Sequence, residues 1–145
     1  MTPEATAAVG SEATGHEPLQ ASAVILSLTA KDLTQSVAWY RDVLGFTVDY
    51  VRDRDGKPVS AGIRSGAAKV FLNQDDGGRG WTRVKGEGFA ITFETTQDID
   101  AIAARVKARG GTITMEPADM PWGVRMVRLT DADGYRIAVW RPLGA

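Results

Sequence analysis

The sequence predicts a single α+β domain in which two tandem βαβββ modules form a mixed sheet with helices on its outer face. The main observation is an internal repeat, because a strand, a helix and three further strands are expected twice along the 145 residues. Asp32 in the first copy matches Asp98 in the second, and Gly45 matches Gly111. Two copies are too few for a solenoid. A duplicated module of this kind gives an antiparallel-rich sheet covered by helices.

The composition supports one domain and excludes several classes of partner. A chain of 145 residues is about the length of one domain. The 17 basic and 18 acidic residues leave a net charge of -1, so neither nucleic acid nor a membrane surface is expected as a partner. No apolar run approaches the roughly 20 residues of a membrane-spanning helix. Cysteine is absent, which excludes disulfides and thiolate chemistry and favours a cytoplasmic location.

The first module begins with a strand of β-forming apolar residues, AVILSLT. Asp32 follows as a helix N-cap, with Gln35 three residues later in a capping-box arrangement. The helix has apolar residues at helical spacing and ends at Gly45. Strands of this module are expected at residues 23–29, 46–52, 59–64 and 69–74, with a turn signal at 54–56.

The second module repeats this order after a polar, glycine-rich segment. Asp98 is its expected helix N-cap, and the helix ends at Gly110. A loop is expected to contain Pro117 and Pro121, and a hairpin turn is expected at 131–134. Strands of this module are expected at residues 88–95, 112–115, 124–129 and 135–140.

These elements divide the chain into a flexible N-terminal tail and one domain. The tail is rich in Ala, Thr, Glu, Gly and Pro, a composition typical of disorder, and it contains His16, the only histidine. The expected boundaries are 1–21 for the tail and 22–145 for the domain, with the first module at about 22–75, a linker at 76–87 and the second module at 88–143.

Several charged residues have simple structural interpretations. Asp75 and Asp76 are expected to accept hydrogen bonds from turn amides, although a lid with a polar gate is the alternative. Asp131 and Asp133 are interpreted as turn residues. Arg105, Lys107 and Arg109 lie near the end of the second helix, where they complement the helix dipole without needing a partner.

Four segments resemble the vicinal oxygen chelate superfamily, which includes glyoxalase I, extradiol dioxygenases and bleomycin-resistance proteins. They are DLTQSVAWYRDVLGF, NQDDGGRGWTRVKGEGF, PWGVRMVRLTDADG and LTDADGYRIAVWRP. The third is most similar to the bleomycin-resistance-like, metal-free branch. The last resembles the closing hairpin of the superfamily, with Ala132 in place of Pro and Tyr135 in place of Asn. The resemblance implies that the sheet curves around a cleft.

In enzymes of this superfamily, two ligands from each module hold a divalent metal ion. The resemblance places these positions at Ile25, Ala90, Ala138 and either Val70 or Phe71, depending on the hairpin register. None of these side chains can coordinate a metal. We therefore expect no metal and no cofactor, and neither glyoxalase I nor extradiol dioxygenase activity.

A shift of the alignment by one or two residues is an alternative to a missing metal site. It would bring Ser27, Asn73, Thr92 or Glu94 to the cleft. One carboxylate among neutral oxygens is a poor site for a transition metal, so these residues are interpreted as polar lining.

Aromatic and long side chains on the strands and loops that face the implied cleft are candidates for ligand binding. A cleft lined by aromatic rings can stack a flat organic molecule and bind it by burial. The alternative is that these residues belong to the core or to a dimer contact. The expected cleft residues are Ser27, Tyr50, Phe71, Asn73, Trp81, Thr92, Glu94, Trp122, Met126 and Trp140.

The leading functional hypothesis is a homodimeric, metal-free binding protein. Each of its two clefts would hold a hydrophobic or aromatic small molecule, either neutral or cationic. The protein would thereby sequester an antibiotic or a metabolite. One alternative is a superfamily enzyme, either a lyase or isomerase or a dioxygenase, with displaced metal ligands or none. Another is a structural or regulatory protein whose cleft is filled.

Overall fold

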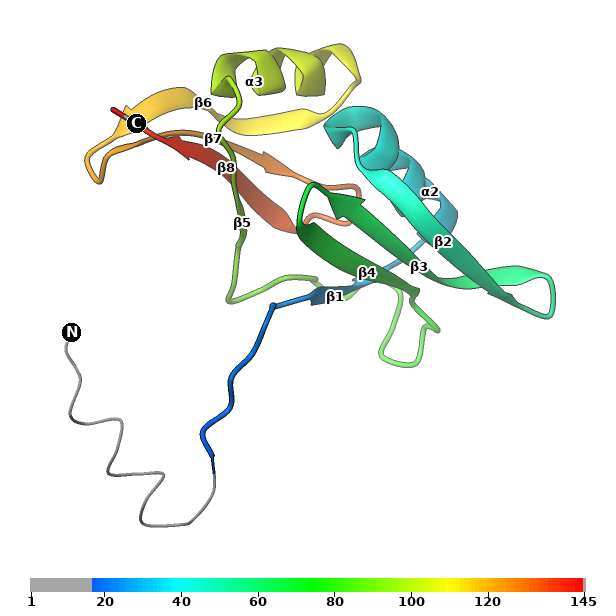
Figure 1. Cartoon of the computed structure of the whole chain (residues 1–145). Coiled ribbons are helices and arrows are strands. Elements are labelled where there is room, and N and C mark those ends of the chain that lie inside the picture. Colours follow the sequence, from blue (N-terminus) through cyan, green and yellow to red (C-terminus); the bar gives the residue numbers. More distant parts are fainter. Residues whose placement is uncertain (1–16, 145) are drawn as a thin grey trace.

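The computed structural model describes residues 17–144, so His16 and most of the expected tail lie outside the described residues. Two four-stranded sheets form the domain, with strand orders β1-β4-β3-β2 and β5-β8-β7-β6 (Figure 1). In each sheet the first strand pairs in parallel and the other neighbours are antiparallel. This arrangement confirms the α+β fold of two βαβββ modules.

The elements follow the expected order in both modules. The first contains β1 (Leu26–Ala30), α2 (Leu33–Trp39), η1 (Tyr40–Leu44), β2 (Thr47–Arg54), β3 (Lys57–Ser65) and β4 (Ala68–Gln74). The second contains β5 (Ile91–Glu94), α3 (Ile99–Ala108), β6 (Thr112–Met120), β7 (Val124–Thr130) and β8 (Arg136–Pro142). Among the described residues, no helix is long and apolar enough to cross a membrane.

The first helix begins and ends where the sequence predicts, but its last turn is wider than an α-helix. Asp32 caps its start by accepting a hydrogen bond from the Gln35 amide. At the other end the Gly45 amide donates to the Tyr40 carbonyl five residues earlier, which defines the π-turn η1. Gly45 has a φ of 80°, a left-handed conformation that glycine adopts without strain.

The strand β6 is longer than expected and corrects the prediction of a loop around Pro117. Pro117 lies within β6, which runs from Thr112 to Met120. Because β6 is at the edge of its sheet, a residue without an amide hydrogen can be accommodated there. The pairing of β6 with β7 also shifts between Met115 and Ala118, as expected for a bulge.

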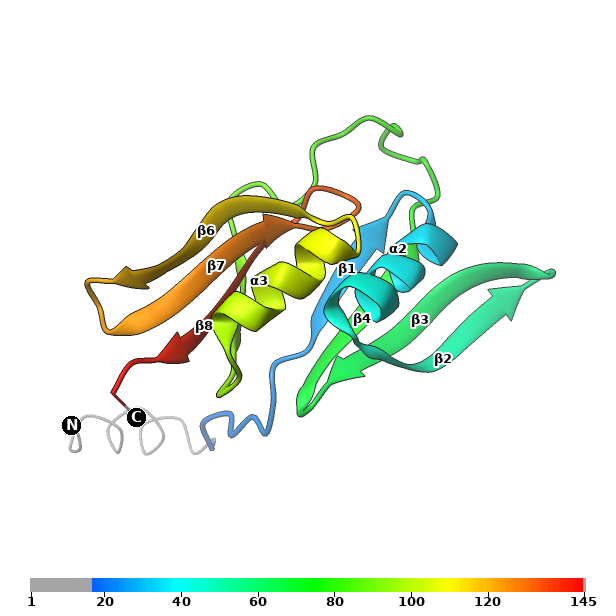
Figure 2. The same cartoon turned by 90° about the horizontal axis from the view of Figure 1, so that it is seen from above.

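The two modules share one hydrophobic core on the helix side of the sheets. Helix α3 packs against η1, and the helices lie side by side over the strands (Figure 2). The largest fully buried side chains come from both modules, so neither module closes the core by itself. They include Leu33, Tyr40, Ile63 and Leu72 from the first module and Ile99, Val106, Leu129 and Ile137 from the second.

A buried hydrogen bond joins the modules at the closing hairpin. The Tyr40 hydroxyl donates to Asp131 Oδ2 at 2.6 Å, while Asp131 Oδ1 accepts from the amides of Asp133 and Tyr135. Asp131 is thus a turn residue, as expected, and also the partner of a phenol from the other module. Burial raises the pKa of its carboxyl, although these donors lower it in part. The Tyr40 pKa lies well above 10, again because of burial, so this hydroxyl stays protonated.

Two of the three basic residues near the end of α3 have specific partners in addition to the helix dipole. The Arg105 guanidinium donates to the carbonyls of Val43 and Asp42 at 3.2 and 3.3 Å. Lys107 forms an ion pair with Glu116 at 2.7 Å. Arg105 satisfies backbone oxygens at the end of η1 that would otherwise have no intrahelical partner.

The Tyr40→Phe substitution is expected to lower the free energy of unfolding by about 2 kcal/mol, because it leaves the buried Asp131 oxygen without its donor. Urea unfolding followed by circular dichroism measures this loss. The control is Tyr50→Phe, since the exposed Tyr50 hydroxyl should change stability by less than about 0.5 kcal/mol. Equal losses in the two variants would contradict the assigned role of the Tyr40 hydrogen bond.

Asp131 is expected to make stability depend on pH in the acidic range. Its pKa is raised above 3.8 in the folded chain, so the folded state binds this proton more tightly than the unfolded state. The resulting stabilisation is complete below pH 3.8, and it is lost as the pH rises through the pKa that Asp131 has in the folded chain. Relative to Asp131→Asn, the wild type should therefore lose stability as the pH increases above 3.8, measured by denaturant unfolding at several pH values. A constant difference would show that burial does not shift this carboxyl.

Candidate functional site

The four positions that the resemblance assigns to metal ligands carry no metal-binding side chain in this chain. Phe71, and not Val70, faces away from the core, because Val70 is buried among core residues. Ile25 precedes β1, Ala90 precedes β5, and Ala138 lies within β8. In the described part of the chain, no three His, Cys, Asp or Glu side chains gather as a metal site. The residues present therefore do not fit the metal that the family's enzymes hold.

Four of the expected cleft residues lie together on the first sheet (β1-β4-β3-β2). Their side chains point away from the helices, on the open face of this sheet. Phe71 is paired with Ser27 on one side and with Gly62 on the other, and Gly62 is paired with Tyr50. Asn73 Nδ2 donates to Ser27 Oγ at 2.8 Å. Phe71 and Tyr50 keep 37% and 44% of their surface exposed.

Four others lie together on the second sheet (β5-β8-β7-β6), on the face that is again turned away from the helices. Trp140 is paired with Glu94 on one side and Met126 on the other, and its indole Nε1 donates to Glu94 Oε1 at 3.2 Å. Thr92 is exposed beside them. Met126 is only 2% exposed, because it packs with Met115, Met120 and Trp140 in a small second cluster. It forms the floor of this face and not its accessible surface.

The two loop tryptophans lie apart from both groups. Trp81 belongs to the linker and is exposed, with its ring against Gly77. Trp122 is exposed at the turn between β6 and β7. The structure therefore divides the expected cleft residues into two groups on two sheets and two separate tryptophans.

Two cavities lie elsewhere in the described chain, and each contains a single expected cleft residue. A groove of about 890 Å³ between the modules is lined by Phe46, Phe93, Ile102 and Arg105, together with Glu94. A smaller polar cavity of about 210 Å³ is lined by Lys31, Arg83, Lys85 and Asp133, together with Trp81.

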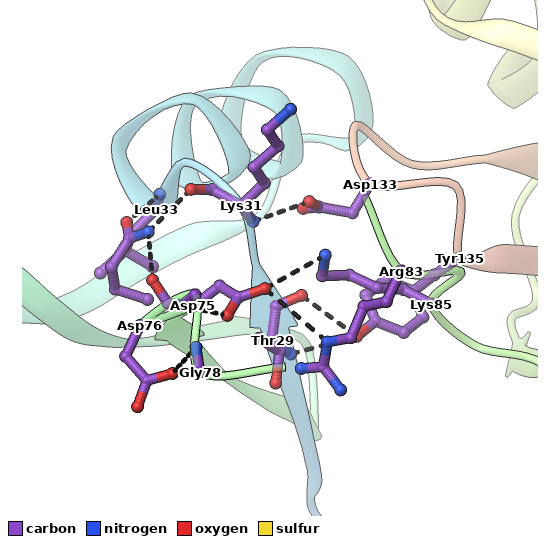
Figure 3. A network of polar contacts seen from close by, with 12 residues as sticks. Thr29, Lys31, Leu33, Asp75, Asp76, Gly78, Arg83, Lys85, Asp133 and Tyr135 are labelled. Carbon is purple, nitrogen blue, oxygen red and sulfur yellow. Dashed lines mark hydrogen bonds and ion pairs between the residues drawn. The ribbon is translucent and has the colours of Figure 1, made fainter. Parts of the chain in front are cut away.

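A buried ion pair holds the linker against the first module (Figure 3). Asp75 Oδ1 accepts a hydrogen bond from the Gly77 amide at 2.9 Å, and Asp76 does the same for Gly78, as expected for turn caps. Asp75 Oδ2 lies 3.3 Å from Lys85 Nζ, and the Lys85 side chain is only 5% exposed. The Gly77 amide and the Lys85 ammonium lower the Asp75 pKa, so this carboxylate is charged. The segment is thereby fixed, which supports its interpretation as a linker.

Sequence reasoning missed three residues that shape these surfaces. Ser60 and Arg52 lie in register with Asn73 on the open face of the first sheet. The alternation of Ser60 and Gly62 with the buried Ala61 could have revealed this face. No sequence signal indicates Lys85, because its partner is determined by the path of the linker.

The sequence matches one known family over most of its length. Residues 22–139 match the Glyoxalase/Bleomycin resistance protein/Dioxygenase superfamily. Over 124 residues, the chain is 28% identical to the anthracycline biosynthesis protein DauV of Streptomyces sp. (strain C5). That alignment covers 79% of this chain and 44% of DauV, so the chain spans less than half of this relative's length.

Solved structures with the same architecture come from several bacteria. TioX from Micromonospora sp. ML1 superimposes with a TM-score of 0.70 at 22% identity, covering 85% of this chain and 100% of TioX. TnmS3, an antibiotic binding protein from Streptomyces sp. CB03234, has a TM-score of 0.66 at 23% identity, covering 86% of this chain and 99% of TnmS3. At these identities the likeness establishes the fold.

The Lys85→Met substitution is expected to lower the melting temperature by several degrees, because it leaves the Asp75 carboxylate buried without its nearest cation. Scanning calorimetry measures the change. The loss should diminish as the pH falls, since Asp75 stabilises the fold above its ordinary pKa of 3.8 and loses this effect once it is protonated. The control, Arg79→Met, removes an exposed cation from the same linker and should leave the melting temperature unchanged.

Proposed function

Because this chain belongs to the glyoxalase/bleomycin resistance protein/dioxygenase superfamily, we propose that it binds a flat aromatic small molecule on the open faces of its sheets, without metal. The observation that carries this proposal is the combination of apolar residues at the family's metal positions with exposed aromatic side chains beside them. Phe71 combines both features, since it is an exposed ring at a position that the resemblance assigns to a metal ligand.

The aromatic side chains on the open faces favour a planar ligand. Phe71 and Tyr50 are neighbours in one row of the first sheet, and Trp140 lies beside Met126 on the second. Rings exposed in this way gain free energy when an apolar surface covers them. A flat aromatic molecule fits such a surface because it can stack on these rings over most of its area.

We propose a homodimer as the form that closes the binding site. The two groups of cleft residues lie on separate sheets, and the helices of both modules pack together on the other side. A second copy could place its second sheet opposite the first sheet of this chain and so enclose a ligand between them. A two-fold arrangement of this kind gives two equivalent sites.

The named relatives support an aromatic natural product as the ligand. TnmS3 is an antibiotic binding protein, and DauV is an anthracycline biosynthesis protein. By analogy with these relatives, this protein would sequester an antibiotic or a related metabolite. Native mass spectrometry of protein purified from its own host would detect the dimer, any bound metal and any retained ligand together. A tightly held metal, with turnover of a catechol or a methylglyoxal–thiol adduct, would favour a superfamily enzyme instead.

The Phe71→Ala substitution is expected to weaken binding of a neutral planar probe, 2-(hydroxymethyl)anthraquinone, by about fivefold, because a stacked aromatic pair contributes about 1 kcal/mol. Tryptophan fluorescence quenching measures the dissociation constant. The control is Val84→Ala, an equally simple truncation of an exposed apolar residue in the linker, which should change affinity by less than about twofold. Unchanged affinity in Phe71→Ala would contradict binding on the first sheet.

A further inference from the structure

We propose that the ligand carries an acidic group, which Arg52 binds beside Ser60 and Asn73 on the open face of the first sheet. This inference rests on the proposed function and specifies its ligand as a flat aromatic anion with an oxygen-rich edge. It follows from the order of side chains across the four strands.

Two parallel rows of residues cross the open face of the first sheet. The first row is mainly apolar, and the second is polar and lies two residues away from it on each strand. In the first row, the register aligns Ser27, Phe71, Gly62 and Tyr50. In the second row, it aligns Thr29, Asn73, Ser60 and Arg52.

The first row provides a flat surface for an aromatic ring system. A Cβ atom at Gly62 would collide with the Tyr50 ring, so glycine at this position lets the ring lie over the backbone of β3. Phe71 is on the other side of Gly62 in the same row. A planar molecule can therefore contact both rings while its edge extends over the second row.

The second row contains polar atoms that lack partners in the described chain. The Ser60 hydroxyl is buried and forms no hydrogen bond with residues 17–144. Asn73 donates through Nδ2 to Ser27 Oγ and the Leu28 carbonyl, and no described residue donates to its own side-chain oxygen. Buried polar groups are nearly always paired in native proteins, so an unpaired one calls for a partner from outside the chain.

Arg52 determines the charge of the expected ligand. Its side chain is exposed at the end of the second row and forms no ion pair within residues 17–144. Arg64 on the same face is already paired with Asp49 at 2.9 Å, whereas Lys69 beside it has no described acidic partner. Asp53, paired with Pro58, is placed on this face by the same register. Arg52 and Lys69 against Asp53 therefore leave one positive charge in excess, which disfavours a cation. A guanidinium can bind a carboxylate through two parallel hydrogen bonds.

The test compares three planar probes that differ in one substituent: anthraquinone-2-carboxylate, 2-(hydroxymethyl)anthraquinone and 2-(aminomethyl)anthraquinone. Calorimetric titration at low salt should give about tenfold tighter binding of the carboxylate than of the neutral alcohol, as expected for one charge-assisted hydrogen-bonded pair. The amine should bind most weakly. The Arg52→Gln variant should bind the carboxylate and the alcohol equally, and Arg52→Lys should restore part of the preference.

Two further variants separate recognition from stability. The control Arg79→Gln removes one positive charge from the linker and should keep the preference for the carboxylate. Ser60→Ala should weaken carboxylate binding by about threefold or more without lowering the melting temperature, because the hydroxyl it removes has no partner in the chain. If Ser60 had only a structural role, the Ser60→Ala substitution would leave the affinity for the carboxylate probe unchanged.

The outcomes distinguish this inference from the function on which it rests. If the carboxylate is not preferred, or if its preference survives in Arg52→Gln, the acidic ligand is excluded while binding of a planar aromatic stands. If none of the three probes binds, both the acidic ligand and the proposed function are overturned.

Discussion

The buried hydrogen bond between Tyr40 and Asp131 lies where the two modules meet, and the rest of the architecture depends on that contact. Tyr40 begins the π-turn at the end of the first helix, and Asp131 begins the closing hairpin of the second module. A buried carboxylate is tolerated only when its oxygens are hydrogen-bonded. Asp131 meets this condition with a phenol from one module and two backbone amides from the other. The same hairpin also contributes Tyr135, whose hydroxyl donates to the Thr29 carbonyl.

Joining the modules on their helix sides determines which surfaces remain available for function. The helices pack on one face of the sheets in a shared core, so the opposite faces of both sheets stay open. Those open faces contain Phe71 and Tyr50 on one sheet and Trp140 on the other. The fold therefore leaves two sheet faces open, and these are the surfaces on which we propose that a ligand binds.

The two open faces differ in their chemistry. On the first sheet, aromatic rings lie beside a polar row that ends at Arg52. On the second sheet, Trp140 is paired with Glu94, and methionines fill the space beneath it. In the proposed dimer, such a pair of faces would hold an aromatic molecule by stacking on both sides and would fix its orientation by charge on one side. In ligand sites a few polar groups commonly provide this orientation, while most of the contact area is apolar.

The local elements could be predicted from the sequence because their signals are local. The N-caps Asp32 and Asp98, the left-handed Gly45 and the closing hairpin all lie where their residue types predict them. The repeat of these signals is sufficient to indicate the duplicated module. The prediction of a chain without the family's metal ligands also rests on residue types, since Ile25, Ala90 and Ala138 offer no donor at the positions that the resemblance assigns to them.

Other features depend on contacts between distant segments, and only the tertiary structure determined them. Strand register decided that Phe71 is on the open face and Val70 is in the core. The edge position of β6 allowed Pro117 into a strand, and the path of the linker brought Lys85 to Asp75. The polar row from Asn73 to Arg52 likewise exists only when three strands are aligned. By itself the sequence determined the duplicated modules and the apolar residue types at the positions that the resemblance assigns to metal ligands, because these depend on residue type and local spacing. The tertiary structure decided which residues share a surface, because strand pairing and packing join parts of the chain that are far apart.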